Sequence, residues 1–193
     1  MRGDDSVKLV IGLGNPGNEY KNTRHNIGFM YLDYILGDDV FYLNKKFNAY
    51  ECEKVINEEK ILFVKPLSYM NLSGEIAIKY MKYYKITGDN LLIIQDDLDL
   101  PVGRYKLMYN RGDGGHNGIK NIFLNVKSRG FLRLKIGISN NKDENTKDYV
   151  LGKFSSSELD IIFNQFERLK DFISDYVSLN RSLLMGKYNT KNK

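Results

Sequence analysis

The hydrophobic positions of this chain fall into short apolar runs that alternate with stretches of helical periodicity. Residues 7–13 read Val-Lys-Leu-Val-Ile-Gly-Leu, a short β-branched run typical of a strand that is covered on both faces. The run ends at residues 14–17, Gly-Asn-Pro-Gly, which favour a turn. Further strands are predicted at residues 47–56, 60–65, 91–96, 104–108 and 131–138.

Other segments carry apolar residues at helical spacing. Helices are predicted at residues 26–36, 73–84 and 118–127. Gly37 follows the first of these helices and is suited to cap it. The sequence Ser-Ser-Ser-Glu at 155–158 resembles a capping box, and it opens the longest amphipathic pattern in the chain.

Strands that alternate with helices predict an α/β layer fold with a mostly parallel sheet. The pattern is continuous enough to form a single domain over residues 1–185, followed by a polar, basic tail at 186–193 that we expect to fray. In such folds, ligands bind beyond the carboxyl ends of the strands. Two segments meet this rule: the loop that carries Asn15 and leads to His25, and the strand end that carries Asp96.

Composition narrows the class of protein. The chain has 193 residues, 42% hydrophobic and 27% charged, with a mean hydropathy of −0.43, which indicates a globular fold. No stretch approaches the ~20 apolar residues that a membrane-spanning helix needs, and none has the character of a signal peptide. The single cysteine, Cys52, excludes an internal disulfide. We therefore expect a reduced, cytoplasmic protein.

The positive charge is concentrated in one part of the chain. The net charge is +5, and residues 101–153 alone hold 11 Lys and Arg against 4 Asp and Glu. A dense basic segment favours a polyanionic partner such as nucleic acid, although a merely solvated surface is an equal alternative on charge alone.

Residues 12–17 match the Gly-x-Gly-x-x-Gly pattern of dinucleotide-binding folds. In those folds a helix begins inside the glycine loop and turns its N-terminus towards the pyrophosphate. Here the loop contains Pro16, and helical periodicity starts only near Asn26. The surrounding pattern therefore argues against a nucleotide site.

Both histidines of the chain lie in polar clusters, His25 before Asn26 and His116 before Asn117. Histidine is the usual general base near neutral pH, although a lone histidine more often caps a helix or packs quietly. The carboxylates after residue 95 could orient a histidine, bind a metal together with both histidines, or simply form an acidic loop. No Gly-x-Ser-x-Gly motif is present, so a histidine-activated water is a plausible nucleophile.

Several of these segments together resemble the bacterial-type peptidyl-tRNA hydrolase family. The matching motifs are Gly-Leu-Gly-Asn-Pro-Gly-Asn-Glu-Tyr at 12–20, Thr-Arg-His-Asn-Ile-Gly at 23–28, Lys-Pro-Leu-Ser-Tyr-Met-Asn-Leu-Ser-Gly at 65–74, Asp-Asp-Leu-Asp-Leu-Pro-Val-Gly at 96–103 and Gly-Gly-His-Asn-Gly-Ile-Lys at 114–120. The resemblance runs in order over about residues 7–185.

This resemblance implies an enzyme that cleaves the ester between a peptide and the 3′ ribose of tRNA, and so recycles tRNA from abandoned translation. It implies a three-layer fold with a twisted mixed sheet flanked by helices, no metal or other cofactor, and a monomer. By resemblance, His25 activates water, Asp96 holds its imidazole, and Asn15 recognises the peptide backbone. Further substrate contacts are implied at Tyr20, Tyr69, Asn71, His116 and Asn117.

The chain departs from the family pattern at Gln95, Met108 and Lys135, where histidine, lysine and arginine are frequent. The candidates to contact the tRNA backbone are Lys106, Arg111, Arg133 and Lys135. The polar loop at 140–147 has a composition that permits mobility over the site.

Three alternatives stay open. A relative could bind RNA without hydrolysing it, although His25, Asn15 and Asp96 are intact. A metal-dependent hydrolase could use His25, His116 and the aspartates, and its activity would not survive chelation. A nucleotide-binding module could use residues 12–17, and binding of NAD or ATP would reveal it.

Overall fold

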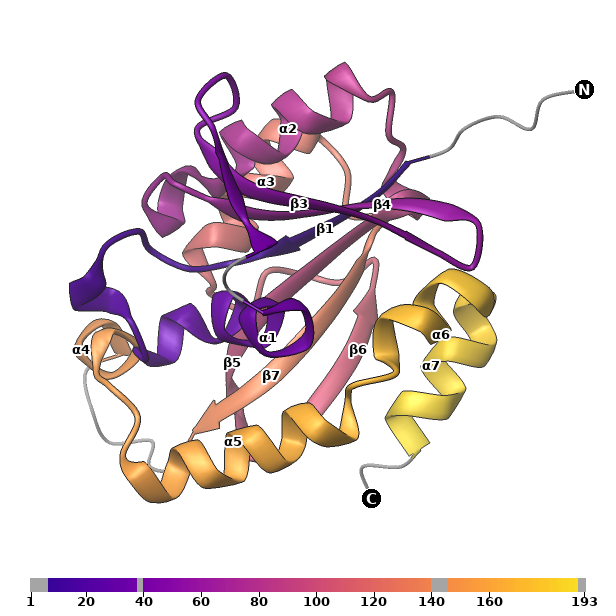
Figure 1. The fold of residues 1–193 in the computed structure, drawn as a ribbon. Coiled ribbons are helices and arrows are strands. Elements are labelled where there is room, and N and C mark those ends of the chain that lie inside the picture. Colours follow the sequence, from indigo (N-terminus) through magenta and orange to yellow (C-terminus); the bar gives the residue numbers. More distant parts are fainter. Residues whose placement is uncertain (1–6, 38–39, 140–145, 191–193) are drawn as a thin grey trace, which may run out of the picture.

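A computed structural model describes residues 7–37, 40–139 and 146–190, which form one sheet with helices on both faces (Figure 1). In these residues, seven strands lie in the order β2-β3-β4-β1-β5-β7-β6. The strands are β1 Lys8–Gly12, β2 Tyr42–Asn44, β3 Ala49–Ile56, β4 Glu59–Pro66, β5 Leu91–Pro101, β6 Tyr105–Tyr109 and β7 Leu132–Ser139.

The sheet is mixed, as the resemblance implied. The centre is parallel, because β1 pairs with β4 and β5, and β5 pairs with β7. The pairings of β2 with β3, β3 with β4, and β6 with β7 are antiparallel. The parallel share is thus half of the pairings, less than the alternation of strands and helices predicted. Asn57 and Glu58 explain one antiparallel pairing, because both have positive φ and close a tight hairpin between β3 and β4.

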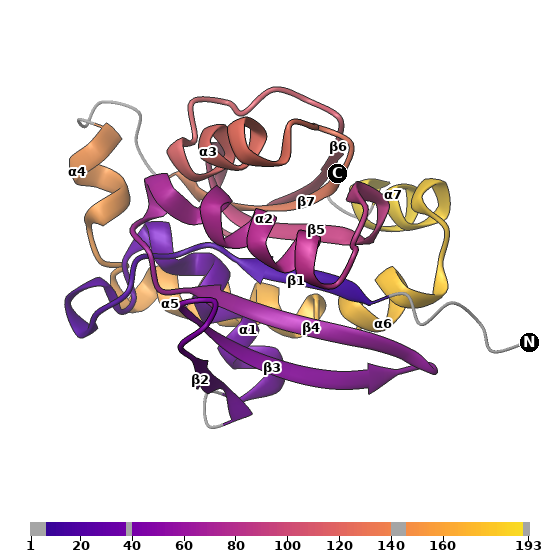
Figure 2. The same cartoon turned by 90° about the horizontal axis from the view of Figure 1, so that it is seen from above.

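Helices form the outer layers on both sides of the sheet (Figure 2). The helices are α1 Ile27–Leu36, α2 Ser73–Tyr83, α3 Asn117–Val126, α4 Thr146–Leu151, α5 Ser156–Arg168, α6 Phe172–Ser178 and α7 Arg181–Thr190. Helices α2 and α3 cover one face, while α1, α5 and α6 cover the other. None of the helices in the described ranges is long and apolar enough to cross a membrane.

The side chains of β1 show why the central strands are apolar throughout. Leu9 and Ile11 pack with α2 and α3, whereas Val10 points to the opposite cluster with α1 and α5. All three are fully buried, so each face of the strand needs a hydrophobic partner. This packing confirms that residues 7–13 form a strand covered on both faces.

The long amphipathic pattern after residue 155 spans two helices. Ser155 and Glu158 form the predicted capping box, in which the Ser155 hydroxyl accepts from the Glu158 amide and the Glu158 carboxylate accepts from the Ser155 amide. Helix α5 ends at Arg168, where the hydroxyl of Tyr31 donates a hydrogen bond to the carbonyl of Leu169 (2.8 Å). This bond ties the break between α5 and α6 to α1.

The expectation that the chain frays from Gly186 is wrong, because α7 continues to Thr190. Tyr188 is buried against the core, and its hydroxyl donates to Asp175. The Asn189 side chain lies beside the outer edge of β6, where it accepts from the Leu107 amide (2.8 Å) and donates to the Leu107 carbonyl (3.1 Å). A polar sequence therefore continues the fold through specific hydrogen bonds.

Replacing Asn189 with alanine is expected to lower the free energy of unfolding by about 1–2 kcal/mol, because the backbone groups of Leu107 lose both partners. Denaturant unfolding measures the change. Ser182→Ala, at an exposed position of the same helix, is the control and should change stability by less than about 0.5 kcal/mol. Equal stability of the Asn189 variant and the parent would contradict the role of this contact.

Candidate active site

A cleft of about 980 Å³ opens at the carboxyl ends of β1 and β5, the place that the α/β pattern predicted. The loop after β1, residues 95–99 in the second half of β5 and the start of α3 all contribute to its wall. Nine of the twelve residues predicted for the site line this cleft: Asn15, Tyr20, His25, Tyr69, Asn71, Asp96, His116, Asn117 and Lys135.

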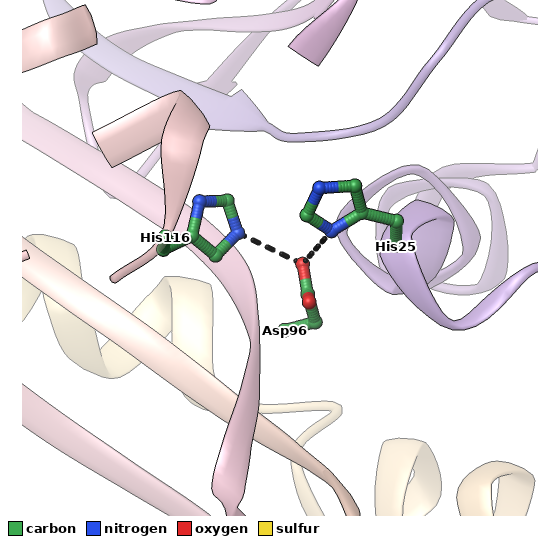
Figure 3. Close-up of side chains that lie close together, drawn as sticks. All are labelled: His25, Asp96 and His116. Atoms are coloured by element: carbon green, nitrogen blue, oxygen red, sulfur yellow. Dashed lines mark hydrogen bonds and ion pairs between the residues drawn. The ribbon is translucent and has the colours of Figure 1, made fainter. Parts of the chain in front are cut away.

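Both histidines bond the same carboxylate oxygen at the centre of the cleft (Figure 3). His25 lies on a 3-10 turn, Arg24–Asn26, and its Nδ1 is 2.8 Å from Oδ1 of Asp96. His116 precedes α3, and its Nε2 is 2.9 Å from the same oxygen. The two imidazole rings lie 5.0 Å apart, centre to centre.

The backbone at the start of α3 fixes the proton on His116. Its Nδ1 accepts hydrogen bonds from the amides of Gly118 (3.1 Å) and Ile119 (3.3 Å), and so caps the helix. A nitrogen that accepts an N–H carries no proton, so Nε2 must carry it and donate to Asp96. His116 is therefore a neutral donor to the carboxylate.

His25 takes the opposite tautomer. Its Nδ1 carries the proton that is donated to Asp96, which leaves the lone pair on Nε2. Among the described residues, this Nε2 has no hydrogen-bond partner, and the side chain lines the cleft. The arrangement is that of a general base oriented by a carboxylate.

Burial and charge act in opposite directions on this group. Burial lowers the pKa of His25, but the charge and the hydrogen bond of Asp96 outweigh it, so the pKa lies above its usual value of 6.5. Burial raises the pKa of Asp96, but both histidines hold it well below its ordinary range. Asp96 is thus a buried carboxylate that stays ionised because two donors face it.

The same three side chains are the only described group with metal-ligating spacing, since their ligand atoms lie within 4.8 Å of one another. The helix cap argues against a metal there. To bind a metal, Nε2 of His116 would have to lose its proton, and Nδ1 would then carry one that faces the amide of Gly118. The observed hydrogen bonds therefore do not suit a metal ligand set.

Asn15 is held so that its amide group faces the cleft as a donor. Its Oδ1 accepts from the Met70 amide (2.7 Å), and its backbone N–H and C=O both bond the side chain of Asn26 (2.9 Å each). Within the described part of the chain, Asn15 Nδ2 has no hydrogen-bond partner. It remains available to a ligand carbonyl.

Helix α4 forms one wall of the cleft and is joined to the loop of His25. The guanidinium of Arg24 lies 4.2 Å from the ring centre of Tyr149 and pairs with Glu158 at 3.2 Å. The Arg24 amide also donates to the carbonyl of Gly152 (3.0 Å). The residues at 140–145 of the polar loop lie outside the described residues, whereas Lys147 lines the cleft.

The four cations predicted to contact tRNA lie in different environments. Lys106 and Arg111 are exposed and lie outside the cleft. Lys135 lines the cleft, where it pairs with Asp97 at 2.5 Å. Arg133 is only 1% exposed, so the position of its guanidinium does not support the predicted contact with phosphate.

Sequence reasoning missed Asn26, Met70 and the residues of α4 as parts of the site. Asn26 stands directly after His25 in the motif Thr-Arg-His-Asn, so its place in that motif was a usable signal. Met70 acts through its backbone amide, which no side-chain pattern reveals. The glycine-rich loop at 12–17 behaves as the sequence indicated, because α1 begins only at Ile27.

Comparison with known proteins agrees with the architecture and with the motifs. The sequence profile of the peptidyl-tRNA hydrolase family matches residues 9–193. A peptidyl-tRNA hydrolase of Listeria monocytogenes serotype 4a (strain HCC23) is 40% identical over 186 residues, covering 96% of this chain and 100% of the relative. One of Clostridium botulinum (strain Alaska E43 / Type E3) is 38% identical over 182 residues, covering 94% and 95%.

Solved structures give the same result. The crystal structure of peptidyl-tRNA hydrolase from Acinetobacter baumannii aligns with a TM-score of 0.86 at 30% identity, over 96% of this chain and 94% of that chain. The match covers the sheet, the helices and the cleft region alike, since almost no part of either chain is left out. This chain belongs to the peptidyl-tRNA hydrolase family.

Proposed function

We propose that the cleft hydrolyses the ester between a peptide and the 3′ ribose of tRNA, with a water molecule activated by His25. The observation that carries this proposal is the bond between His25 and Asp96, which leaves Nε2 of His25 free at a cleft lined by asparagine amides. Every group of the mechanism comes from one chain. By the family resemblance, we expect a monomer that acts in the cytoplasm, where translation supplies the substrate.

Each protein group has a defined part in the reaction. Nε2 of His25 accepts a proton from water, and the water oxygen attacks the ester carbonyl carbon. Negative charge then develops on the carbonyl oxygen, where the amide groups of Asn71 and Asn117 can donate hydrogen bonds. When the ester bond breaks, the 3′ oxygen takes the proton from the His25 imidazolium. Asp96 stabilises that imidazolium between the two steps.

The Nδ2 donor of Asn15 supports a choice between blocked and free aminoacyl groups. A peptidyl group offers a carbonyl oxygen on its α-nitrogen, which can accept from Nδ2. A free aminoacyl group offers an ammonium there, which can only donate. Because Met70 fixes the Asn15 amide through its oxygen, the side chain cannot turn to accept from that ammonium without losing the bond.

Two features support hydrolysis without a resident metal. The protons of both histidines are committed to Asp96, and the cap of α3 depends on the unprotonated Nδ1 of His116. Activity that returns only after metal is added to chelated protein would favour the metal-dependent alternative instead.

Chelator-treated protein should release the acyl group from N-acetyl-aminoacyl-tRNA but leave unacetylated aminoacyl-tRNA intact. His25→Ala should lower kcat by about 10²–10⁴-fold, the usual contribution of a general base. Acid-precipitable label on the tRNA follows the reaction. A protein that binds tRNA and releases nothing would support the RNA-binding alternative and overturn the catalytic assignment.

Asp96→Asn should shift the acidic limb of the pH profile of kcat/KM to lower pH. Activity needs the neutral form of His25. The charge of Asp96 raises the pKa of His25, whereas burial lowers it. When that charge is removed, burial remains, and the pKa of His25 falls. An amide oxygen can keep both histidine bonds, because both end on one oxygen. We expect kcat to fall by about 10²–10⁴-fold. An acidic limb that stays in place or moves to higher pH would contradict the role of Asp96.

Exposed cations should make substrate binding depend on salt. For the parent, log kcat/KM should fall linearly with log salt concentration, and Arg111→Ala should make the slope shallower by about one. Lys54→Ala removes another exposed cation, on β3, and serves as the control. Equal slopes for the Arg111 and Lys54 variants would show that Arg111 does not contact the tRNA backbone.

A further inference from the structure

Arg133 has the largest fully buried side chain of the described residues, at 1% exposure. It lies on β7, whose neighbouring side chains Leu132 and Leu134 belong to the core. Burying a guanidinium is costly unless its charge is paired, and burial lowers the pKa of Arg133 accordingly. The charges of Asp113 and Asp97 act against this lowering of the pKa, but in the described chain neither carboxylate lies within ion-pair distance of the guanidinium.

The guanidinium instead donates to three uncharged oxygen atoms. Its Nη2 donates to the carbonyl of Gly112 (2.8 Å) and to that of Arg111 (3.0 Å). Its Nη1 donates to Oε1 of Gln95 (3.4 Å). A planar group with several donors can bridge a strand and a loop in this way, which a lysine cannot reproduce.

The loop that Arg133 holds has few other anchors. Residues 111–115 form neither helix nor strand, and Gly114 and Gly115 have positive φ. A Cβ atom added at Gly112, Gly114 or Gly115 would meet nothing within 4 Å, so packing does not hold the loop in place. The one side-chain bond inside it joins Asp113 Oδ1 to the Gly115 amide.

This loop leads directly into His116 and Asn117, which line the cleft. The other acceptor, Gln95, donates through Nε2 to the backbone carbonyl of Asp96 (3.2 Å). One guanidinium therefore connects the residue before Asp96 with the loop before His116. Asp96 and His116, the residues that directly follow these two anchored segments, form a hydrogen bond with each other.

We infer that Arg133 is a positioning residue, which fixes the loop at 111–115 and thereby places His116 and Asn117 at the cleft. Its effect on hydrolysis rests on the proposed function, but its effect on the loop does not. Because Arg133 bonds the Arg111 carbonyl, it also fixes the backbone position from which the exposed Arg111 side chain extends into solvent. Arg133, one of the cations predicted from the sequence to contact the tRNA backbone, thus acts from inside the protein.

Arg133→Met separates positioning from stability. Methionine fills much of the same space, and replacing a buried charge with an apolar side chain is often neutral or stabilising. Amide hydrogen exchange of the substrate-free protein should become faster by about tenfold or more at Gly115 and His116, the two amides of this loop region that donate hydrogen bonds, since a hydrogen bond to a charged group is worth that factor. Exchange in β1 and β5 should stay unchanged.

The change in KM should accompany the change in hydrogen exchange of the loop. KM for N-acetyl-aminoacyl-tRNA should rise by about tenfold, while the acidic limb of the pH profile stays in place because His25 and Asp96 keep their bond. Arg133→Lys keeps the charge but loses the planar set of several donors. It should therefore show the same faster exchange in the loop as Arg133→Met, and its KM should return at most partly to the parent value.

Arg129→Met is the matched control. Arg129 is exposed and lies over the ring of Phe123 at 5.4 Å, as Arg133 does at 5.6 Å, but it does not bond the loop. Its loop exchange should equal that of the parent. Unchanged exchange at Gly115 and His116 in Arg133→Met, or faster exchange spread evenly over the sheet, would overturn the inference. If the Met variant does not fold, the same comparison in Arg133→Lys decides. The exchange result stands even if the protein hydrolyses nothing.

Discussion

The arrangement of the cleft depends on one carboxylate oxygen, Oδ1 of Asp96, which accepts from both histidines. A buried carboxylate is stable only where donors surround it, so the chain must bring His25 and His116 to the same point. The two rings reach this oxygen through different nitrogens, Nδ1 of His25 and Nε2 of His116, and they also differ in what the second nitrogen contacts. The second nitrogen of His116 accepts from the amides that begin α3, whereas among the described residues that of His25 has no hydrogen-bond partner. Asymmetry in the backbone thus leaves one of two similar side chains with an unbonded nitrogen at the cleft, and this is the histidine that we propose as the base.

The sheet brings these groups together because β1 and β5 are parallel neighbours. Strand β5 continues past the carboxyl end of β1, so the loop that carries Asn15 and His25 lies beside the part of β5 that carries Asp96. Further hydrogen bonds then set the details: the Met70 amide donates to Asn15, and the Arg133 side chain donates both to the Gln95 side chain and to carbonyls of the loop before His116. The chemistry is carried by few side chains, and their positions are set by many backbone groups.

Much of the fold could be predicted from the sequence, because the central strands are apolar on both faces and the capping box at Ser155 is a local signal. The short elements β2 and α4 could not, since three and six residues give no periodicity to read. Arg133 alternates with leucines along β7, a pattern that indicates a solvent-facing side chain. The loop at 111–115 covers it, and the sequence of a strand does not show what covers its second face.

The bond between Asn189 and β6 has a consequence for the time before folding is complete. Strand β6 is the last in the sheet order, so its outer backbone groups would accept another strand if nothing covered them. Asn189 satisfies the amide and the carbonyl of Leu107, yet it follows every strand in the chain. During synthesis from the N-terminus, the sheet therefore keeps one open edge until α7 has emerged. Protection from strand exchange with other nascent chains comes last.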